Sequence, residues 1–391
     1  MEIIKNIHFV GISTNEEKLF ENLWELDYGV TYNSYLLIGE KVALIEGCPS
    51  KYFPILKENI EKICPLKNLS YLVLNHLEPD HSEAVLNLLE DAPNLEILTT
   101  KMGVSMLLNF YGVKERVKEV KDGETIDLGT FSLKFISSPF IHWPETMMTF
   151  EEKSKTLFSG DCFGGFGELK DTIFAEENKD AIFEEERYRY FVNILSSYTK
   201  HIEKAITKIE ALNPQNLCPS HGYIFKEPQN IISTYKKWCS YSNSPQESYI
   251  PIVVSTMYGV SFKAAELIKQ VFEKLGFCTA IWDLTSIQSS HILKEIYKAK
   301  ALVIVSSTYD GGLFPKMADF LFRAKAKEIK NKKVLFLGSF AWGGGAFKEF
   351  DEWAKRLNWQ VVAFVEFKGA YDMYKEKLEE AGVSFIQSIK D

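Results

Sequence analysis

The chain has 391 residues, of which 46% are hydrophobic and 25% are charged. Its net charge of −8 disfavours nucleic acid as a partner, because phosphate binding needs a basic surface. It has no long apolar run that would span a membrane, and its first residues lack the order of a signal peptide, so we expect a cytoplasmic protein. The six cysteines form no C-x-x-C pair, which argues against a disulfide framework and against a rubredoxin-type iron site.

The first two thirds of the chain mix strands and helices without a regular alternation. A helix is predicted over residues 82–93, with Ser82 as its N-cap and Pro93 at its end, and a long helical stretch is predicted over 180–211. A hairpin turn is expected at Gly39–Glu40. The pattern indicates a layered α/β fold. The predicted strands are 31–39, 41–47, 71–75, 131–138, 146–152 and 155–161.

A polar segment with a proline, residues 240–249, is the best candidate for a linker. Beyond it, apolar strands alternate with helical patterns such as the one over 262–275, which predicts a doubly wound parallel sheet. The chain is too long for one ordinary core, so we predict two domains, residues 1–248 and 249–391. The predicted strands of the second domain are 250–255, 301–306, 333–339 and 360–367.

Residues 75–84, NHLEPDHSEA, place ionisable side chains directly after a predicted buried strand, in the spacing H-x-E-x-D-H. Three further candidates follow other predicted strands, and four of the seven histidines lie in these loops. Charged groups beside a core are costly unless something pairs with them, and a metal is the usual partner. The candidates are His76, Glu78, Asp80, His81, His142, Asp161 and His221.

Taken singly, these residues have ordinary explanations. A lone histidine after a strand is usually a hydrogen-bonded loop residue, and Asp161 alone would be a cap. Glu83 falls in the first turn of the predicted helix, where a carboxylate favours the helix dipole, so we do not count it as a ligand. Cys162 and Cys218 are interpreted as small core residues, although Cys218 and His221 have a possible ligand spacing.

In the second domain, the strand PIVVS runs into TMYGVS and then a helix, which suits a phosphate held by backbone N–H groups at a helix N-terminus. It has neither the glycine pattern of a dinucleotide fold nor a P-loop. Loops 306–315 and 338–347 follow the predicted strands 301–306 and 333–339 of this domain, at the strand ends where ligands of parallel sheets bind. The alternative for Gly343–Gly345 is that these glycines merely turn the chain.

The order H-x-E-x-D-H, then His, Asp and His, resembles the metallo-β-lactamase superfamily. Glu78, where hydrolases of that superfamily usually carry histidine, together with TYNSYLL, HWPETM and LFSGDCFG, resembles the flavodiiron proteins. The resemblance implies an N-terminal metallo-β-lactamase-like αββα sandwich and a C-terminal flavodoxin-like sheet. It also implies two irons per chain. It assigns His76, Glu78 and His142 to one iron and Asp80, His81 and His221 to the other, with Asp161 bridging.

TMYGVS resembles the phosphate loop of flavodoxins, with Val260 and Ser261 as mild departures, and STYDGG stands where that family usually has PTxNNG. The resemblance implies FMN, with Trp342 and Tyr309 beside its ring. The expected FMN contacts are Thr256, Met257, Tyr258, Gly259, Val260, Ser261, Ser307, Thr308, Tyr309, Asp310, Gly311, Ser339, Phe340, Ala341, Trp342, Gly343 and Gly344.

The expected function is therefore an oxidoreductase that reduces O2 to water, NO to N2O, or both. The resemblance further implies a head-to-tail homodimer or a dimer of dimers. Because the chain ends at Asp391 without a cysteine-rich module, we expect a separate electron donor, such as rubredoxin or another flavoprotein. Two alternatives remain: a dinuclear zinc hydrolase with a flavin-binding appendage, which Glu78 disfavours, and an electron carrier whose first domain is structural.

Overall fold

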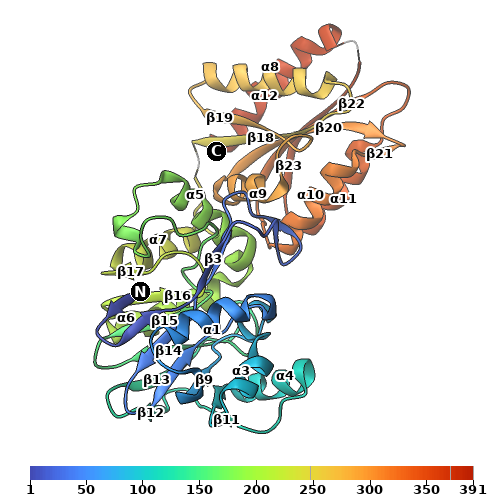
Figure 1. Cartoon of the computed structure of the whole chain (residues 1–391). Coiled ribbons are helices and arrows are strands. Elements are labelled where there is room, and N and C mark those ends of the chain that lie inside the picture. Colours follow the sequence, from blue (N-terminus) through green and yellow to red (C-terminus); the bar gives the residue numbers. More distant parts are fainter. Residues whose placement is uncertain (247, 370, 391) are drawn as a thin grey trace. The chain divides into compact units, whose positions relative to one another are not determined.

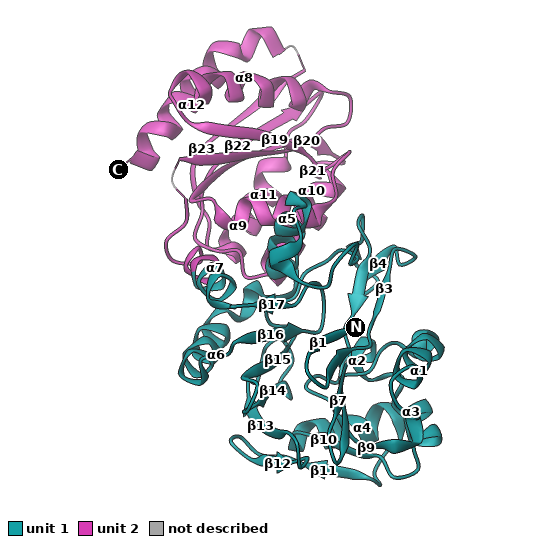
Figure 2. Ribbon diagram, turned by 60° about the vertical axis from the view of Figure 1, so that its left-hand side comes forward, with its two compact units in different colours: residues 1–236 teal, residues 237–391 magenta. Residues whose placement is uncertain are grey.

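The computed structural model describes residues 1–246, 248–369 and 371–390. Compact packing divides the chain into unit 1, residues 1–236, and unit 2, residues 237–391 (Figure 2). The domain boundary that we expect between residues 248 and 249 remains a prediction. Within the described ranges, every helix is too short or too polar to cross a membrane.

Unit 1 contains two large sheets and two short two-stranded sheets, β3–β6 and β4–β5. The first sheet has seven strands in the order β1-β2-β7-β8-β9-β10-β11, and the second has six in the order β12-β13-β14-β15-β16-β17. The strand bounds are β1 Glu2–Ile4, β2 Ile7–Phe9, β3 Ile12–Thr14, β4 Leu19–Phe20, β5 Trp24–Glu25, β6 Val30–Tyr32, β7 Tyr35–Ile38, β8 Val42–Ile45, β9 Leu69–Val73, β10 Glu96–Thr99, β11 Val117–Glu119, β12 Thr125–Asp127, β13 Ser132–Ser137, β14 Met147–Glu151, β15 Thr156–Gly160, β16 Asn216–Pro219 and β17 Phe225–Lys226.

The core of unit 1 lies between the two sheets. Leu37, Ile45 and Val73 of the first sheet belong to the same buried cluster as Phe135 and Phe158 of the second. Figures 1 and 2 show α1, α3 and α4 beside the first sheet and α6 and α7 beside the second, which is the expected αββα sandwich. The helix bounds are α1 Phe53–Glu61, α2 Pro79–Ser82, α3 Val85–Asp91, α4 Lys101–Tyr111, α5 Ala181–Tyr190, α6 Thr199–Leu212 and α7 Gln229–Ser240.

Strand direction brings the metal-site loops together. β13 is antiparallel to β14, β14 is antiparallel to β15, and β15 is parallel to β16, so β13, β15 and β16 point the same way. The loops after these three strands therefore leave the same edge of the second sheet. They contain His142, Asp161 and His221, while the remaining candidates follow β9 of the first sheet.

Unit 2 is a parallel sheet in the order β19-β18-β20-β22-β23, with the short strand β21 paired to β20. The first two strands of this unit, β18 and β19, lie side by side, and the later strands add on the β18 side, as in flavodoxin. Figure 1 shows α8 and α12 on one face of the sheet and α9, α10 and α11 on the other. The bounds are β18 Tyr249–Ser255, α8 Val260–Lys274, β19 Cys278–Asp283, α9 Ser289–Lys298, β20 Ala301–Tyr309, β21 Gly312–Leu313, α10 Pro315–Ala326, β22 Lys333–Phe340, α11 Ala346–Leu357, β23 Gln360–Lys368 and α12 Lys375–Lys390.

Two local predictions were wrong. Ser82 is not an N-cap: it ends α2, and its hydroxyl donates within the preceding turn to the carbonyls of Leu77 and Glu78. The predicted helix over 82–93 is thus divided into α2 and α3. Glu83 lies between them, where its carboxylate accepts a hydrogen bond from Ser50 N at 2.8 Å, instead of lying in a first helical turn.

The helical stretch expected over 180–211 is observed with internal irregularity. It begins with α5, passes through a π-helical turn at Phe191–Leu195 and a 3-10 turn at Ser196–Tyr198, and continues as α6 to Leu212. π-Helical turns often occur near functional sites. Here the turn directly follows Tyr190, a residue of the site described next.

Candidate functional site

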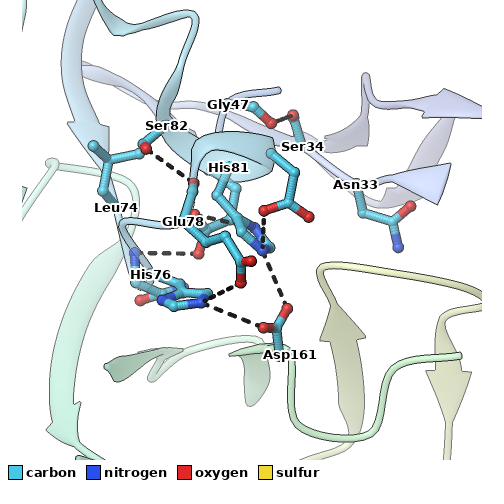
Figure 3. Close-up of polar contacts among 12 residues, drawn as sticks. Asn33, Ser34, Gly47, Leu74, His76, Glu78, His81, Ser82 and Asp161 are labelled. Atoms are coloured by element: carbon cyan, nitrogen blue, oxygen red, sulfur yellow. Dashed lines mark hydrogen bonds and ion pairs between the residues drawn. The ribbon is translucent and has the colours of Figure 1, made fainter. Parts of the chain in front are cut away.

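The seven metal-ligand candidates converge in unit 1. The ligand atoms of His76, Glu78, His142 and Asp161 all lie within 4.8 Å of one another, and those of Asp80, His81 and His221 do likewise. Figure 3 shows His76, Glu78 and His81 directed towards Asp161. The side chains come from four loops that are far apart in the sequence, so the fold itself assembles the site.

Asp161 lies between the two groups, with one carboxylate oxygen towards each. Oδ2 is 3.6 Å from His76 Nε2 and 3.3 Å from His142 Nε2. Oδ1 is 3.2 Å from His81 Nε2 and 3.3 Å from His221 Nε2. A carboxylate in this position has the geometry to bridge two cations, one in each group.

Each group also has its own carboxylate. Glu78 Oε2 lies 3.2 Å from His76 Nε2 and 3.1 Å from His142 Nε2. The two oxygens of Asp80 face the two histidines of the other group, with Oδ1 at 3.3 Å from His81 Nε2 and Oδ2 at 3.3 Å from His221 Nε2. Both groups therefore offer two imidazole nitrogens and carboxylate oxygens to a common point.

The site fits metal ions because several of these atoms have no other use. Within the described part of the chain, five buried atoms of the second group and the bridge make no hydrogen bond: both oxygens of Asp80, Nε2 of His81 and His221, and Oδ1 of Asp161. Buried polar atoms without partners are costly, and a bound cation would satisfy all of them together. The arrangement of donors, two imidazoles and carboxylates per group, suits transition metals.

Electrostatics also favours positive charge at the centre. Burial alone lowers the pKa of His142 and His221, but the facing carboxylates, Asp161 together with Glu78 or Asp80, outweigh it and raise these pKa values to about 9 and about 10. Burial likewise raises the pKa of Asp161, yet the surrounding histidines hold it well below its usual range. Metal ions would therefore displace protons from these imidazoles when they bind.

Groups outside the predicted ligand set fix the orientation of the histidines. Glu145 Oε1 accepts a hydrogen bond from His76 Nδ1 at 2.7 Å and another from Leu77 N at 2.9 Å. The backbone carbonyl of Thr31 accepts one from His221 Nδ1 at 2.6 Å. These bonds leave Nε2 of both rings free for a metal. We did not single out Glu145 in the sequence, although it lies in the HWPETM motif.

Tyr190 is a second residue that sequence reasoning missed. Its ring lies 5.8 Å from the His221 ring and packs against Phe20 and Phe166, and the side chain is fully buried. Among the described residues, its hydroxyl has no hydrogen-bond partner. Burial, followed by the negative charge of Asp161, raises the pKa of this phenol well above its usual value. Tyr190 therefore stays protonated and can donate a hydrogen bond.

The second candidate site is a cavity of about 260 Å³ in unit 2, at the carboxyl ends of the parallel strands. Thirteen of the seventeen expected FMN contacts line it, and Gly369, after β23, lines it as well. Gly369 was not predicted, because the expected contacts came only from the loops after β18, β20 and β22, and Gly369 follows β23. The thirteen are Met257, Tyr258, Val260, Ser307, Thr308, Asp310, Gly311, Ser339, Phe340, Ala341, Trp342, Gly343 and Gly344.

The four other expected contacts, Thr256, Gly259, Ser261 and Tyr309, do not line the cavity. Thr256 Oγ1 accepts a hydrogen bond from Gly259 N at 2.9 Å and so shapes the phosphate loop. The buried Ser261 hydroxyl bonds inward to Ser339 Oγ at 2.8 Å. The direct phosphate contacts of these hydroxyls remain a prediction.

The cavity fits a flavin phosphate and ring. Gly259 begins α8 in a left-handed conformation, with φ of 87°, and no side chain caps the N–H groups of this helix, so they are available to an anion. Thr308 lines the cavity, and its buried Oγ1 makes no hydrogen bond to any described residue. Trp342 and Tyr258 are 91% and 89% exposed at the rim, where they could cover an aromatic ring.

Two known protein families match this chain, one in each of its two units. Residues 30–222 match a family described as ODP family beta lactamase, and residues 252–381 match flavodoxin. The chain is 30% identical to the nitric oxide reductase of Moorella thermoacetica over 92% of its own length and 91% of that protein.

Two solved structures share the whole fold. The rubredoxin oxygen:oxidoreductase of Desulfovibrio gigas superposes with a TM-score of 0.95 at 27% identity, covering 100% of this chain and 98% of the other. A mutant of a flavo di-iron protein from Thermotoga maritima superposes with a TM-score of 0.91 at 27% identity, with the same coverage.

Proposed function

This chain is a flavodiiron protein, a member of the family of O2 and NO reductases, and from that membership we propose that it reduces O2 to water, NO to N2O, or both, with electrons delivered through FMN. The observation that supports this proposal best is the position of Asp161 between two groups of ligand atoms, which suits a pair of metal ions. A pair of metal ions is what two-centre chemistry on a diatomic gas requires.

We propose iron for both positions, because Glu78 adds a hard, negatively charged donor where an imidazole would favour zinc. When bound, the iron pair supplies the sites at which the gas binds, and FMN supplies the electrons. The proposed ligands are His76, Glu78 and His142 for one iron, Asp80, His81 and His221 for the other, and Asp161 as the bridge.

The protein's own residues then have distinct tasks. Glu145 and the Thr31 carbonyl hold the rings of His76 and His221 with Nε2 towards the centre. Tyr190 keeps its proton at the phenolic oxygen and can donate a hydrogen bond to an oxygen atom within the site. Phe20 and Phe166, packed around Tyr190, exclude water from this side.

The partners follow from the same proposal. We propose a separate electron donor, and the name of the Desulfovibrio gigas relative suggests a rubredoxin. We also propose a head-to-tail homodimer, or a dimer of such dimers, since the flavin and the metal pair belong to separate units of one chain and electrons must pass between them.

Metal and flavin analysis, followed by rapid mixing, tests the proposal. The purified protein should contain two irons and one FMN per chain. After anaerobic reduction, mixing with O2 or with NO should reoxidise the flavin within the time of a single turnover, without release of peroxide. Two zincs per chain would support the hydrolase alternative, and slow reoxidation with accumulating peroxide would support a simple electron carrier.

A further inference from the structure

The two loops expected to hold the flavin ring, residues 306–315 and 338–347, touch each other through their backbones. Gly345 has a φ of 139°, and a Cβ atom placed on it would overlap the carbonyl oxygen of Gly311. Only glycine permits both this conformation and this approach. The shape of one loop therefore depends on the position of the other.

Glu366 connects the second of these loops to the neighbouring strand. It lies on β23 beside Gly338 of β22. A Cβ atom at Gly338 would be 3.2 Å from Glu366 Cγ, so the missing side chain gives the glutamate room to lie across the strand. From there, Oε1 accepts hydrogen bonds from Gly345 N at 3.3 Å and from Phe347 N at 3.4 Å.

These two N–H groups belong to the first turn of α11, of which Gly345 is the N-cap. Gly345 has no side chain to cap the helix, so the carboxylate of Glu366 does this from another strand. A helix N-terminus beside a cofactor cavity would otherwise attract an anionic part of the ligand. In this chain, a protein carboxylate already occupies that position.

The same carboxylate adjoins the wall of the cavity. Gly344 lines the cavity, and a Cβ atom at Gly344 would lie 3.2 Å from Glu366 Oε1. The backbone of one glycine thus separates the carboxylate from the space that a flavin ring would fill. Two-electron reduction leaves a flavin ring anionic near neutral pH, so a negative charge fixed beside the cavity disfavours the reduced form.

We propose that Glu366 is a positioning residue of the flavin site: it holds loop 338–347 in place and its charge lowers the reduction potential of the bound flavin. The inference rests on the proposed binding of FMN. It gives two separable effects, because the hydrogen bonds need only an acceptor oxygen, whereas the effect on potential needs the negative charge. Glu366→Gln keeps an acceptor and removes the charge, and Glu366→Ala removes both.

The control is Glu352→Gln, which removes the same charge from an exposed position in the middle of α11. FMN affinity is measured by fluorescence quenching on titrating flavin-depleted protein, and flavin potentials are measured by spectroelectrochemistry of the reloaded protein. We expect Glu366→Gln to bind FMN with nearly unchanged affinity. It should also favour the anionic reduced flavin roughly tenfold, about 59 mV for a one-electron step. We expect Glu366→Ala to raise the Kd for FMN about tenfold, the effect of losing a cap.

Unchanged potentials in Glu366→Gln, or an equal shift in Glu352→Gln, would overturn the inference even if Glu366→Ala failed to fold. If the wild-type chain binds FMN but the Glu366 variants give one of these results, the proposed function stands and only this inference fails. A wild-type chain that binds no FMN overturns the proposed function and this inference together. The two failures are therefore distinguishable in one series of measurements.

Discussion

Replacement of Glu145 by glutamine should weaken metal binding in the group that contains His76. Glu145 is buried, and burial raises its pKa, but the hydrogen bond from His76 lowers it below the usual value, so the side chain is a carboxylate. At 2.7 Å from Nδ1, it fixes the ring with Nε2 towards the ligand centre and makes that nitrogen more basic. Loss of such a carboxylate typically costs 10–100-fold in metal affinity, about 1.4–2.7 kcal/mol.

Glutamine can still accept the hydrogen bond, so Glu145→Gln should lie near the tenfold end of this range. Glu145→Ala should lie near the hundredfold end, because it also leaves Leu77 N without its acceptor. The assay is anaerobic titration with Fe²⁺ in competition with a chelator, with anomalous diffraction from partly loaded crystals to show which position loses iron.

Glu46→Gln is the matched control. Glu46 is equally buried, but its Oε2 lies 3.9 Å from His81 Nδ1, beyond hydrogen-bond distance, so the effect on affinity should be smaller than that of Glu145→Gln. Unchanged affinity in Glu145→Gln, or loss of iron chiefly from the position beside His221, would refute the reasoning.

Four further predictions concern single side chains. Asp161→Asn should reduce the occupancy of both metal positions, whereas His221→Ala should reduce mainly one, and full iron in both variants by elemental analysis would exclude a bridging role for Asp161. Glu78→His should raise zinc occupancy and abolish gas reduction in rapid-mixing assays, and unchanged turnover would contradict the argument from carboxylate donors. Tyr190→Phe should keep both irons but slow gas reduction by 10²–10⁴-fold if its proton is used in the reaction, and an unaltered rate would assign it to packing alone. Lys332 is buried, and burial lowers the pKa of its ammonium group to about 7. Between pH 7 and 10.5 the folded chain therefore binds fewer protons than the unfolded chain, so the free energy of unfolding should rise across this window by at most about 5 kcal/mol. Thermal unfolding of Lys332→Met as a function of pH should lack this rise.

The metal site could be predicted because strand direction determines where loops emerge. His142, Asp161 and His221 follow strands that point the same way, so the loops that carry them leave one edge of the second sheet. The supporting residues could not be found in the same way. Glu145 is 69 residues from His76 and Tyr190 precedes a helical irregularity, and in both cases the contact depends on the packing of separate elements.

The local errors have equally physical reasons. Ser82 has the side chain of an N-cap, but the helix begins at Pro79, before Ser82, and the serine hydroxyl donates within α2. The strand β19 gave no clear signal because it is an edge strand whose residues are half-buried or exposed, so it lacks an apolar run. The contact of Ser261 with a phosphate remains a prediction, because its hydroxyl bonds to Ser339 in the chain itself.

Both candidate sites contain a carboxylate behind the residues that face the ligand. Glu145 acts on the metal site through His76, and Glu366 adjoins the flavin cavity behind Gly344 and Gly345. Neither carboxylate needs to touch the ligand, so each can change metal affinity or flavin potential while the facing residues remain in place. The variants Glu145→Gln and Glu366→Gln test this directly, because each preserves the shape of the side chain and removes its charge. If charge is what these positions supply, Glu145→Gln should change metal affinity and leave the flavin potential unchanged. Glu366→Gln should change the flavin potential and leave metal affinity unchanged.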